Sequence, residues 1–115
     1  MTEKDDLVFI NHILDSIDAI ENFSKNISKE RLIPNRLKQS AIVREIEIIG
    51  EAVKNISESL KNKHQEIEWK DIVATRAKMI HHYFGVDLNI IWNIIKKDIP
   101  TLKKQIEKIK KELSD

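Results

Sequence analysis

The segment from Arg76 to Tyr83 of this 115-residue chain contains a permanent cation, two titratable imidazoles and a phenol. Arginine presents a planar set of donors that matches phosphate oxygens, and histidine changes its charge near neutral pH. Tyrosine donates a hydrogen bond or acts as a nucleophile. These are the groups that phosphate chemistry requires, so Arg76, His81 and Tyr83 are candidate functional residues.

The spacing of these three residues limits how one helix could present them. At about 100° per residue, Tyr83 falls about 20° from Arg76 around the helix, whereas His81 falls about 140° away. One unbroken helix therefore does not aim all three side chains at a single phosphate. Either the helix is irregular between Arg76 and Tyr83, or a second copy of the chain completes the site across a two-fold axis.

Hydrophobic residues recur at helical spacing along most of the chain, which predicts the elements that position the candidate residues. The stripe from Leu7 to Phe23 predicts an amphipathic helix of about five turns. After a polar stretch that contains Pro34, a second helix is predicted from about Asn35 to Leu60. No strand alternation, repeat or low-complexity linker is present. The pattern predicts one all-α domain over residues 1–115, an antiparallel bundle of four to five helices.

The second half of the chain carries the remaining helices. A third helical segment contains Trp69 and the candidate residues, and we expect Gly85 to end it and Asp87 to cap the next helix. That fourth helix is predicted from Leu88 to about Lys97, and Pro100 fits the first turn of a last helix. The second and fourth helices have wider apolar faces than a bundle of this size needs, which predicts a homodimer. The residues that widen these faces are Ile46, Ile49, Ile90, Ile91 and Ile94.

Composition excludes several classes of protein. With 41% hydrophobic and 34% charged residues, the chain is not disordered. No apolar run approaches the roughly 20 residues of a membrane-spanning helix, and the charged stretch from Met1 to Asp6 is unlike a signal peptide. We therefore expect a cytoplasmic protein with no membrane partner. The absence of cysteine excludes disulfides and thiolate metal sites.

Charge is distributed unevenly although the net charge is only +1. Residues 1–30 carry a net charge of −4, and residues 96–112 carry +4 with seven lysines. This lysine strip is typical of a solvated helix face whose cations complement the carboxyl end of the helix dipole. The alternative is a surface that follows an RNA backbone.

The candidate residues also have ordinary structural interpretations. Arg76 could pair with a glutamate of the preceding helix, and Tyr83 could be half-buried with its hydroxyl on a carbonyl. These glutamates are Glu45, Glu47 and Glu51, of which Glu51 is a secondary candidate for the site. Adjacent helical positions diverge by about 100°, so His81 and His82 are not expected to share a metal ion, and no cofactor is expected. His12 and His64 lack companions of catalytic type and are expected at the surface or at helix caps.

The chain resembles the HepT-like family of the HEPN superfamily, whose signature is Arg, four to six residues, His, one residue and Tyr. Arg76, His81 and Tyr83 match this signature. Residues 41–52 and 83–100 look like the family's second helix and closing segment, so the resemblance covers nearly the whole chain, from Leu7 to Leu113. His82 also satisfies the looser Arg-to-His spacing of the superfamily, so it is a secondary candidate, and only the step to Tyr83 selects His81. One difference is Ala77, where many members carry Asn or Asp.

This resemblance implies an HEPN-like fold and a homodimer whose motifs line a shared cleft. It implies a toxin that acts as a metal-independent endoribonuclease on RNA, with Arg76 stabilising phosphoryl charge and His81 moving a proton. It further implies a nucleotidyltransferase antitoxin partner that transfers AMP to Tyr83. The alternative is a non-catalytic dimeric helical module that binds a nucleotide or a nucleotidyltransferase partner.

Overall fold

The computed structural model describes residues 3–81 and 88–114, with side chains described for residues 5–75 and 88–114. Within this part of the chain, all regular structure is helical, which confirms the prediction of an all-α fold. The elements are α1 (Glu3–Ser24), α2 (Lys29–Leu32), α3 (Arg36–Asn55), α4 (Glu58–Lys63), α5 (Trp69–His81), α6 (Leu88–Asn93), a π-helical turn η1 (Ile94–Asp98) and α7 (Ile99–Ser114). No helix of the described part is long and apolar enough to cross a membrane.

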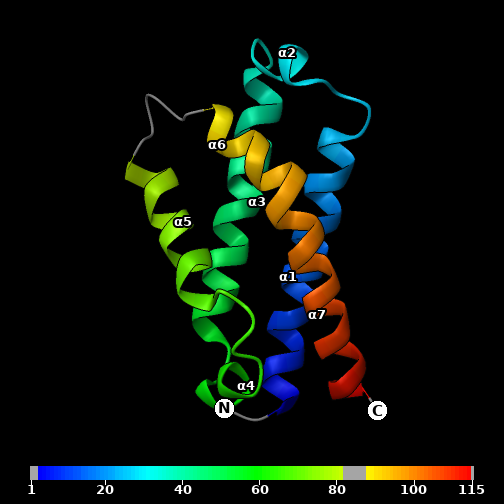
Figure 1. Ribbon diagram of the computed structural model, residues 1–115, viewed down its shortest axis with the longest axis vertical. Coiled ribbons are helices and arrows are strands. Elements are labelled where there is room, and N and C mark those ends of the chain that lie inside the picture. Colours follow the sequence, from blue (N-terminus) through cyan, green and yellow to red (C-terminus); the bar gives the residue numbers. More distant parts are fainter. Residues whose placement is uncertain (1–2, 82–87, 115) are drawn as a thin grey trace.

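The long helical segments run alternately up and down and form an antiparallel bundle (Figure 1). Helix α1 packs against both α3 and α7, and α3 packs against α5. Isoleucine dominates the core, and α1 supplies four isoleucines that have no exposed surface. These are Ile10, Ile13, Ile17 and Ile20. Their spacing of three and four residues places them on one face, and burying each contributes about 1.5–3 kcal/mol.

The predicted second helix is shorter than expected, because α3 ends at Asn55 and not near Leu60. Its start is confirmed, since the Asn35 side chain accepts a hydrogen bond from the Lys38 backbone N–H at 3.0 Å. At its end, Ile56 is extended and Ser57 caps the separate helix α4 by accepting a hydrogen bond from the Leu60 N–H. A new cap at Ser57 competes with continuation of the helix.

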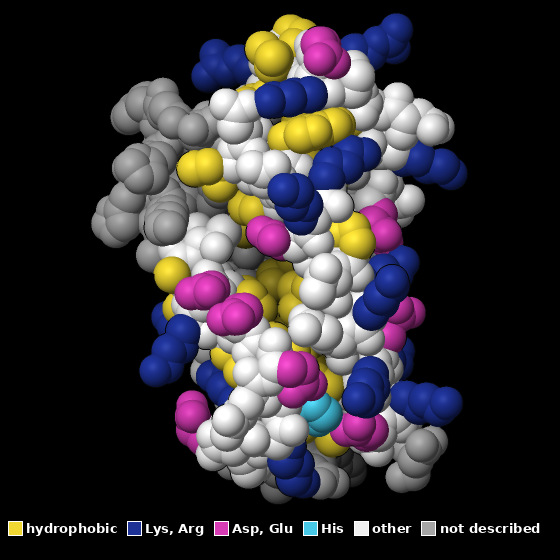
Figure 2. Space-filling view, viewed as in Figure 1, with side chains coloured by type: hydrophobic (Ala, Val, Ile, Leu, Met, Phe, Trp, Pro, Cys, Tyr) yellow, Lys and Arg dark blue, Asp and Glu magenta, His cyan; other side chains and the backbone are white. Residues whose placement is uncertain are grey.

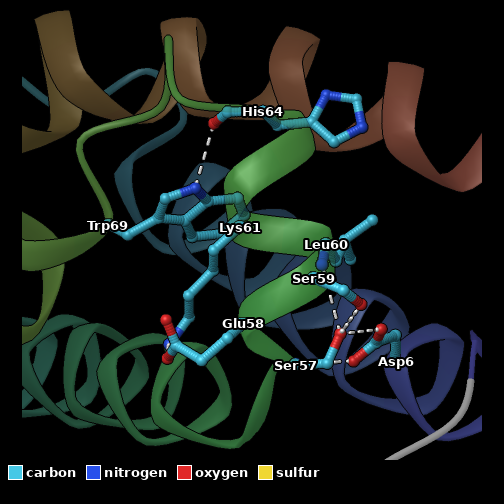
Figure 3. Close-up of polar contacts among 8 residues, drawn as sticks. All are labelled: Asp6, Ser57, Glu58, Ser59, Leu60, Lys61, His64 and Trp69. Atoms are coloured by element: carbon cyan, nitrogen blue, oxygen red, sulfur yellow. Dashed lines mark hydrogen bonds and ion pairs between the residues drawn. The ribbon is translucent and has the colours of Figure 1, made fainter.

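Asp6 holds this break in place from the first turns of α1. The Ser57 backbone N–H donates to one Asp6 carboxylate oxygen at 2.8 Å, and the Ser57 hydroxyl donates to the other at 2.6 Å (Figure 3). Asp6 is only 2% exposed, so its carboxylate has exchanged water for these two donors. A contact between residues 51 positions apart thus decides where α3 ends.

We expect Asp6→Ala to lower the free energy of unfolding by about 1–3 kcal/mol, because it leaves a partly buried backbone N–H without an acceptor. The loss corresponds to a fall in Tm of several degrees. Circular dichroism during thermal and urea unfolding measures it. Asp15→Ala is the matched control, since Asp15 is exposed on the same helix, and its effect should stay within about 0.5 kcal/mol. Equal stability of the two variants would contradict the role assigned to Asp6.

As predicted, Pro100 lies in the first turn of the last helix, although α6, η1 and α7 follow one another as one continuous helical run. The Ile99 N–H bonds to the carbonyl of Ile94, a π-helical spacing. The wider turn makes room for the proline ring, which in a regular helix would clash with the carbonyl four residues earlier. The Thr101 hydroxyl donates to the Lys97 carbonyl at 3.1 Å and supplies a further bond at this turn.

The apolar residues that suggested a dimer are mostly buried within the single chain. Ile46, Ile49, Ile91 and Ile94 are at most 7% exposed, and Ile90 alone of the five is substantially exposed, at 42%. The argument from excess apolar width is therefore wrong for four of the five residues, since the bundle itself covers them. The homodimer stays a prediction.

Candidate functional site

Helix α5 carries the first part of the signature. Its backbone is regular α-helix from Trp69 to His81, so the Arg76 and His81 backbone positions diverge by about 140° around one axis. An irregularity after His81 would therefore leave the divergence between Arg76 and His81 unchanged. The side chains from Arg76 to His81 lie outside the described residues, as do His82, Tyr83, Gly85 and Asp87 entirely.

Trp69 anchors the start of α5 on the bundle. Its indole N–H donates to the His64 carbonyl at 3.0 Å, and the side chain is only 8% exposed (Figure 3). One turn further on, Ile72 and Val73 pack against the hydrophobic core. This part of α5 is therefore fixed against its neighbours, and the helix carries Arg76 and His81 onward from it.

His64 caps the end of α4, one of the two roles expected for it, and is buried, with 7% exposure. Its Nε2 atom lies 3.1 Å from a carboxylate oxygen of Glu112 on α7, and its Nδ1 atom lies 3.3 Å from Glu66. The ring points toward α7 (Figure 3). A hydrogen bond from its own backbone N–H lowers the pKa of the Glu66 carboxyl, and His64 adds to this effect. His64 thus links the α4–α5 connection to α7.

His12 is exposed on α1, as expected, and its ring meets the Phe9 ring edge-on with centroids 5.8 Å apart. Glu51, the secondary candidate, is exposed on α3, the helix that packs against α5. Its carbonyl accepts a hydrogen bond from the Asn55 side chain at 2.9 Å. The interpretation that Arg76 pairs with Glu51 stays a prediction.

A central hollow of about 440 Å³ lies between α5 on one side and η1 and α7 on the other. Figure 2 shows its hydrophobic floor open to the surface, with acidic side chains around it. The floor consists of Ile46, Ile49, Ile67, Ile72, Ile94, Ile99 and Leu102. Glu66, Glu68, Asp71 and Asp98 supply the carboxylates, and Thr75, Thr101 and Gln105 are the neutral polar residues. Nothing in the local sequence pattern indicated this feature.

Cations gather at the end of the bundle formed by the α1–α2 connection, α2 and the start of α3. We call this surface the basic end, and its cations are Lys25, Arg31, Arg36 and Lys38. These four residues line one shallow concavity, and Glu30 is the only carboxylate among its described lining residues. None of the four cations has an ion-pair partner in the described part of the chain. Leu37, 82% exposed, lies among them. The α5 and α6 ends at His81 and Leu88 are directed toward this end of the bundle (Figure 1).

The lysine strip of α7 faces the acidic helix α1 along part of its length. The Lys103 ammonium lies 2.8 Å from the Glu21 carboxylate, and this contact raises the pKa of Lys103. Asp15 and Asp18 line a common surface with Lys103, Lys110 and Lys111. The opposite net charges of the two chain ends are therefore partly explained by α1–α7 packing. At Trp92, Lys96 lies over the indole ring at 4.8 Å.

Within residues 5–75 and 88–114, no three His, Asp or Glu side chains are arranged to hold a metal ion. The adjacent pair His81 and His82 lies outside the residues whose side chains are described. The described acidic groups around the central hollow are spread over several elements of the bundle.

The fold is thus an all-helical bundle whose candidate phosphate-binding residues lie toward the end of its third long helix, the arrangement expected of an HEPN-type protein. The family model described as "Ribonuclease HepT-like" matches residues 13–109. The chain belongs to the HepT-like ribonuclease family, which confirms the resemblance drawn from the sequence.

Several curated proteins are similar to the chain. "Probable ribonuclease HepT" of Thermococcus cleftensis is 42% identical over 103 residues, covering 90% of this chain and 94% of that protein. A "Putative RNase" of Caldanaerobacter subterraneus is 43% identical over 101 residues, covering 88% and 90%. "Gamma-glutamylcyclotransferase and putative RNase" of Methanocaldococcus jannaschii is 44% identical over 110 residues, 96% of this chain, and the chain spans 50% of that relative's length. No solved structure matches the chain significantly.

Proposed function

We propose that this protein is a metal-independent endoribonuclease and the toxin of a toxin–antitoxin pair. Membership of the HepT-like ribonuclease family is the observation that carries the proposal. Two further features support it. The Arg76–His81 spacing falls on α5, whose start is anchored by Trp69, and similar proteins are named as ribonucleases.

The proposed reaction uses the RNA's own 2′-hydroxyl as nucleophile. The 2′-oxygen forms a bond to the adjacent phosphorus while the bond to the 5′-oxygen breaks, leaving a 2′,3′-cyclic phosphate and a 5′-hydroxyl. His81 takes the proton from the 2′-hydroxyl or gives one to the 5′-oxygen. Arg76 stabilises the charge that develops on the phosphoryl oxygens, and Tyr83 positions the phosphate or a base.

A homodimer is part of this proposal. Because α5 is regular through His81, its Arg76 and His81 positions face different directions. Two copies related by a two-fold axis could bring Arg76 of one chain near His81 of the other. A partner nucleotidyltransferase would silence the site by transferring AMP to Tyr83.

Cleavage of an RNA oligonucleotide beside its all-2′-deoxy counterpart, in buffer with EDTA, tests the reaction directly. We expect the RNA alone to be cut and its new 3′ ends to carry a cyclic phosphate. Cutting of the deoxy strand, or loss of activity with EDTA, would refute the 2′-hydroxyl mechanism without a metal.

The basic end is the surface that we propose for the RNA backbone. Its cations offer the phosphate contacts that bind RNA irrespective of base sequence. In a His81→Ala background, where RNA stays intact, Arg31→Gln/Arg36→Gln should weaken RNA binding about tenfold. The slope of log affinity against log salt concentration should also become shallower by about 0.7 for each phosphate that the variant no longer neutralises. Fluorescence anisotropy between low and moderate salt measures both quantities.

Two control variants each remove two positive charges at other places on the surface. Lys54→Gln/Lys63→Gln changes two exposed lysines toward the opposite end of the bundle and should leave binding unchanged. Lys110→Gln/Lys111→Gln tests the α7 strip, the alternative suggested by the charge pattern. Weaker binding by this α7 variant, with no change at the basic end, would place the RNA along α7.

Ala77 favours the second candidate, a dimeric helical module that binds a nucleotide or a nucleotidyltransferase partner without turnover. Alanine cannot hydrogen-bond through its side chain beside Arg76, where the Asn or Asp of many members can. Binding of RNA or nucleotide by a pure protein that never cleaves RNA would support this function.

A further inference from the structure

The central hollow combines an aliphatic floor with an acidic rim. Its floor residues come from α3, the α4–α5 connection, α5, η1 and α7, so five segments converge on one open space of about 440 Å³. Helices α5 and α7 flank it and run in opposite directions (Figure 1). An open groove between two helices has the geometry in which a third helix packs.

The negative charge of its lining distinguishes this hollow from the rest of the molecular surface. Among the described residues, its lining includes four carboxylates and no lysine or arginine. Glu66 contacts His64, but Glu68, Asp71 and Asp98 have no ion-pair partner in the described part of the chain. Figure 2 shows the acidic side chains beside the hydrophobic floor, while the upper end of the same face carries Lys and Arg.

The carboxylates of the rim decide which ligand fits. They repel phosphate, so the hollow is unsuited to RNA even though it adjoins the helix that carries Arg76. The floor is aliphatic and mostly buried, so apolar groups that fill the open space above it displace water from an apolar surface. The complement of this surface is a segment with aliphatic side chains on one face and lysine or arginine beside them.

We propose that the central hollow is a docking groove for a basic amphipathic helix of a second protein. Aliphatic residues of that helix, spaced by three and four, fill the hollow, contacting the half-buried Ile72 and the small exposed surfaces of Ile94 and Leu102. Its flanking cations meet Glu68, Asp71 and Asp98. This inference does not depend on the proposed ribonuclease activity, because it uses only the described surface.

Docking here would contact α5 next to the residues proposed to bind phosphate. Thr75 lines the hollow and is half-buried, and Arg76 follows it in the same helix. A partner bound in the groove therefore contacts α5 one residue before the signature begins. Such a partner could remain bound while RNA occupies the basic end.

A synthetic helical peptide with leucine on one face and lysine beside it, labelled with fluorescein, is the probe. Binding to the full chain is measured by anisotropy, and a peptide of the same composition in scrambled order is its control. We expect the ordered peptide to bind at least tenfold more tightly than the scrambled one. Backbone NMR shifts on peptide addition should map to Thr75, Thr101 and Gln105.

Charge reversal makes the test specific. Glu68→Lys/Asp71→Lys changes two exposed residues and should weaken the lysine peptide at least tenfold while improving binding of the same peptide with glutamate in place of lysine. Asp15→Lys/Asp18→Lys is the matched control, with the same charge change at exposed positions of α1, and should leave both affinities nearly unchanged.

Three results would overturn the proposal. Equal binding of the lysine peptide to Glu68→Lys/Asp71→Lys and to Asp15→Lys/Asp18→Lys would show nonspecific attraction. Spermine that displaces the peptide and causes the same NMR shifts would show a site for small polycations. A wild-type dimer in sedimentation that dissociates in Glu68→Lys/Asp71→Lys, with no peptide binding to wild type, would show that a second copy of this chain fills the groove.

Discussion

Replacing His81 with alanine is expected to lower the rate of RNA cleavage by about 10²–10⁴-fold, the usual contribution of a positioned proton-transfer group. The variant loses the group proposed to move a proton at the 2′-hydroxyl or the 5′-oxygen, whereas Arg76 remains to bind phosphate. RNA affinity should therefore change little while the rate falls. Single-turnover cleavage of a structured RNA in EDTA, with affinity measured separately, distinguishes these two effects.

His82→Ala is the matched control, because it removes the same side chain one residue later. Neighbouring positions on a helix diverge by about 100°, so the two histidines cannot serve one phosphate equally. We expect His82→Ala to keep most of the activity. Thermal unfolding of both variants should match that of wild type. Activity that survives in His81→Ala and disappears in His82→Ala would assign the proton transfer to His82.

The second large effect is expected at Tyr83. Co-expression with a cognate nucleotidyltransferase should abolish RNA cleavage by the wild-type protein, whereas Tyr83→Phe should remain active under the same conditions. The phenol oxygen attacks the α-phosphorus of a nucleoside triphosphate, pyrophosphate leaves, and the phenol proton is released. The deprotonated phenol is the nucleophile, and Arg76 is proposed to favour that form.

Loss of activity follows from the chemistry of the product. The modified tyrosine carries a phosphodiester anion and a bulky nucleoside, which compete with RNA for Arg76 by charge and block His81 by volume. Intact mass and peptide mapping should locate one or more AMP units on the Tyr83 peptide, and none in Tyr83→Phe. An inhibited complex whose Tyr83 is unmodified would show that the partner silences the protein by binding alone.

The local sequence pattern was sufficient to predict the positions of most of the helices. The stripe of α1 and the start of α3 near Asn35 depend on neighbours within one or two turns, and both are confirmed. Assignment to the HepT-like family likewise followed from residues that can be read along the chain, and it is confirmed. The roles of Arg76, His81 and Tyr83 stay predictions, because they depend on side-chain positions at the end of α5 and beyond.

Tertiary structure alone decided the features that depend on residues far apart. The end of α3 depends on Asp6 meeting Ser57, and the burial of His64 depends on Glu112 of α7. Similarly, the pairing of Glu21 with Lys103 neutralises charges that appear separate along the chain. Hydrophobic periodicity reports which face of a helix is apolar, but not which helix covers it. For this reason, the sequence suggested that Ile46 and Ile94 face a second copy, whereas packing buries them within one chain, where both contribute to the floor of the acidic hollow.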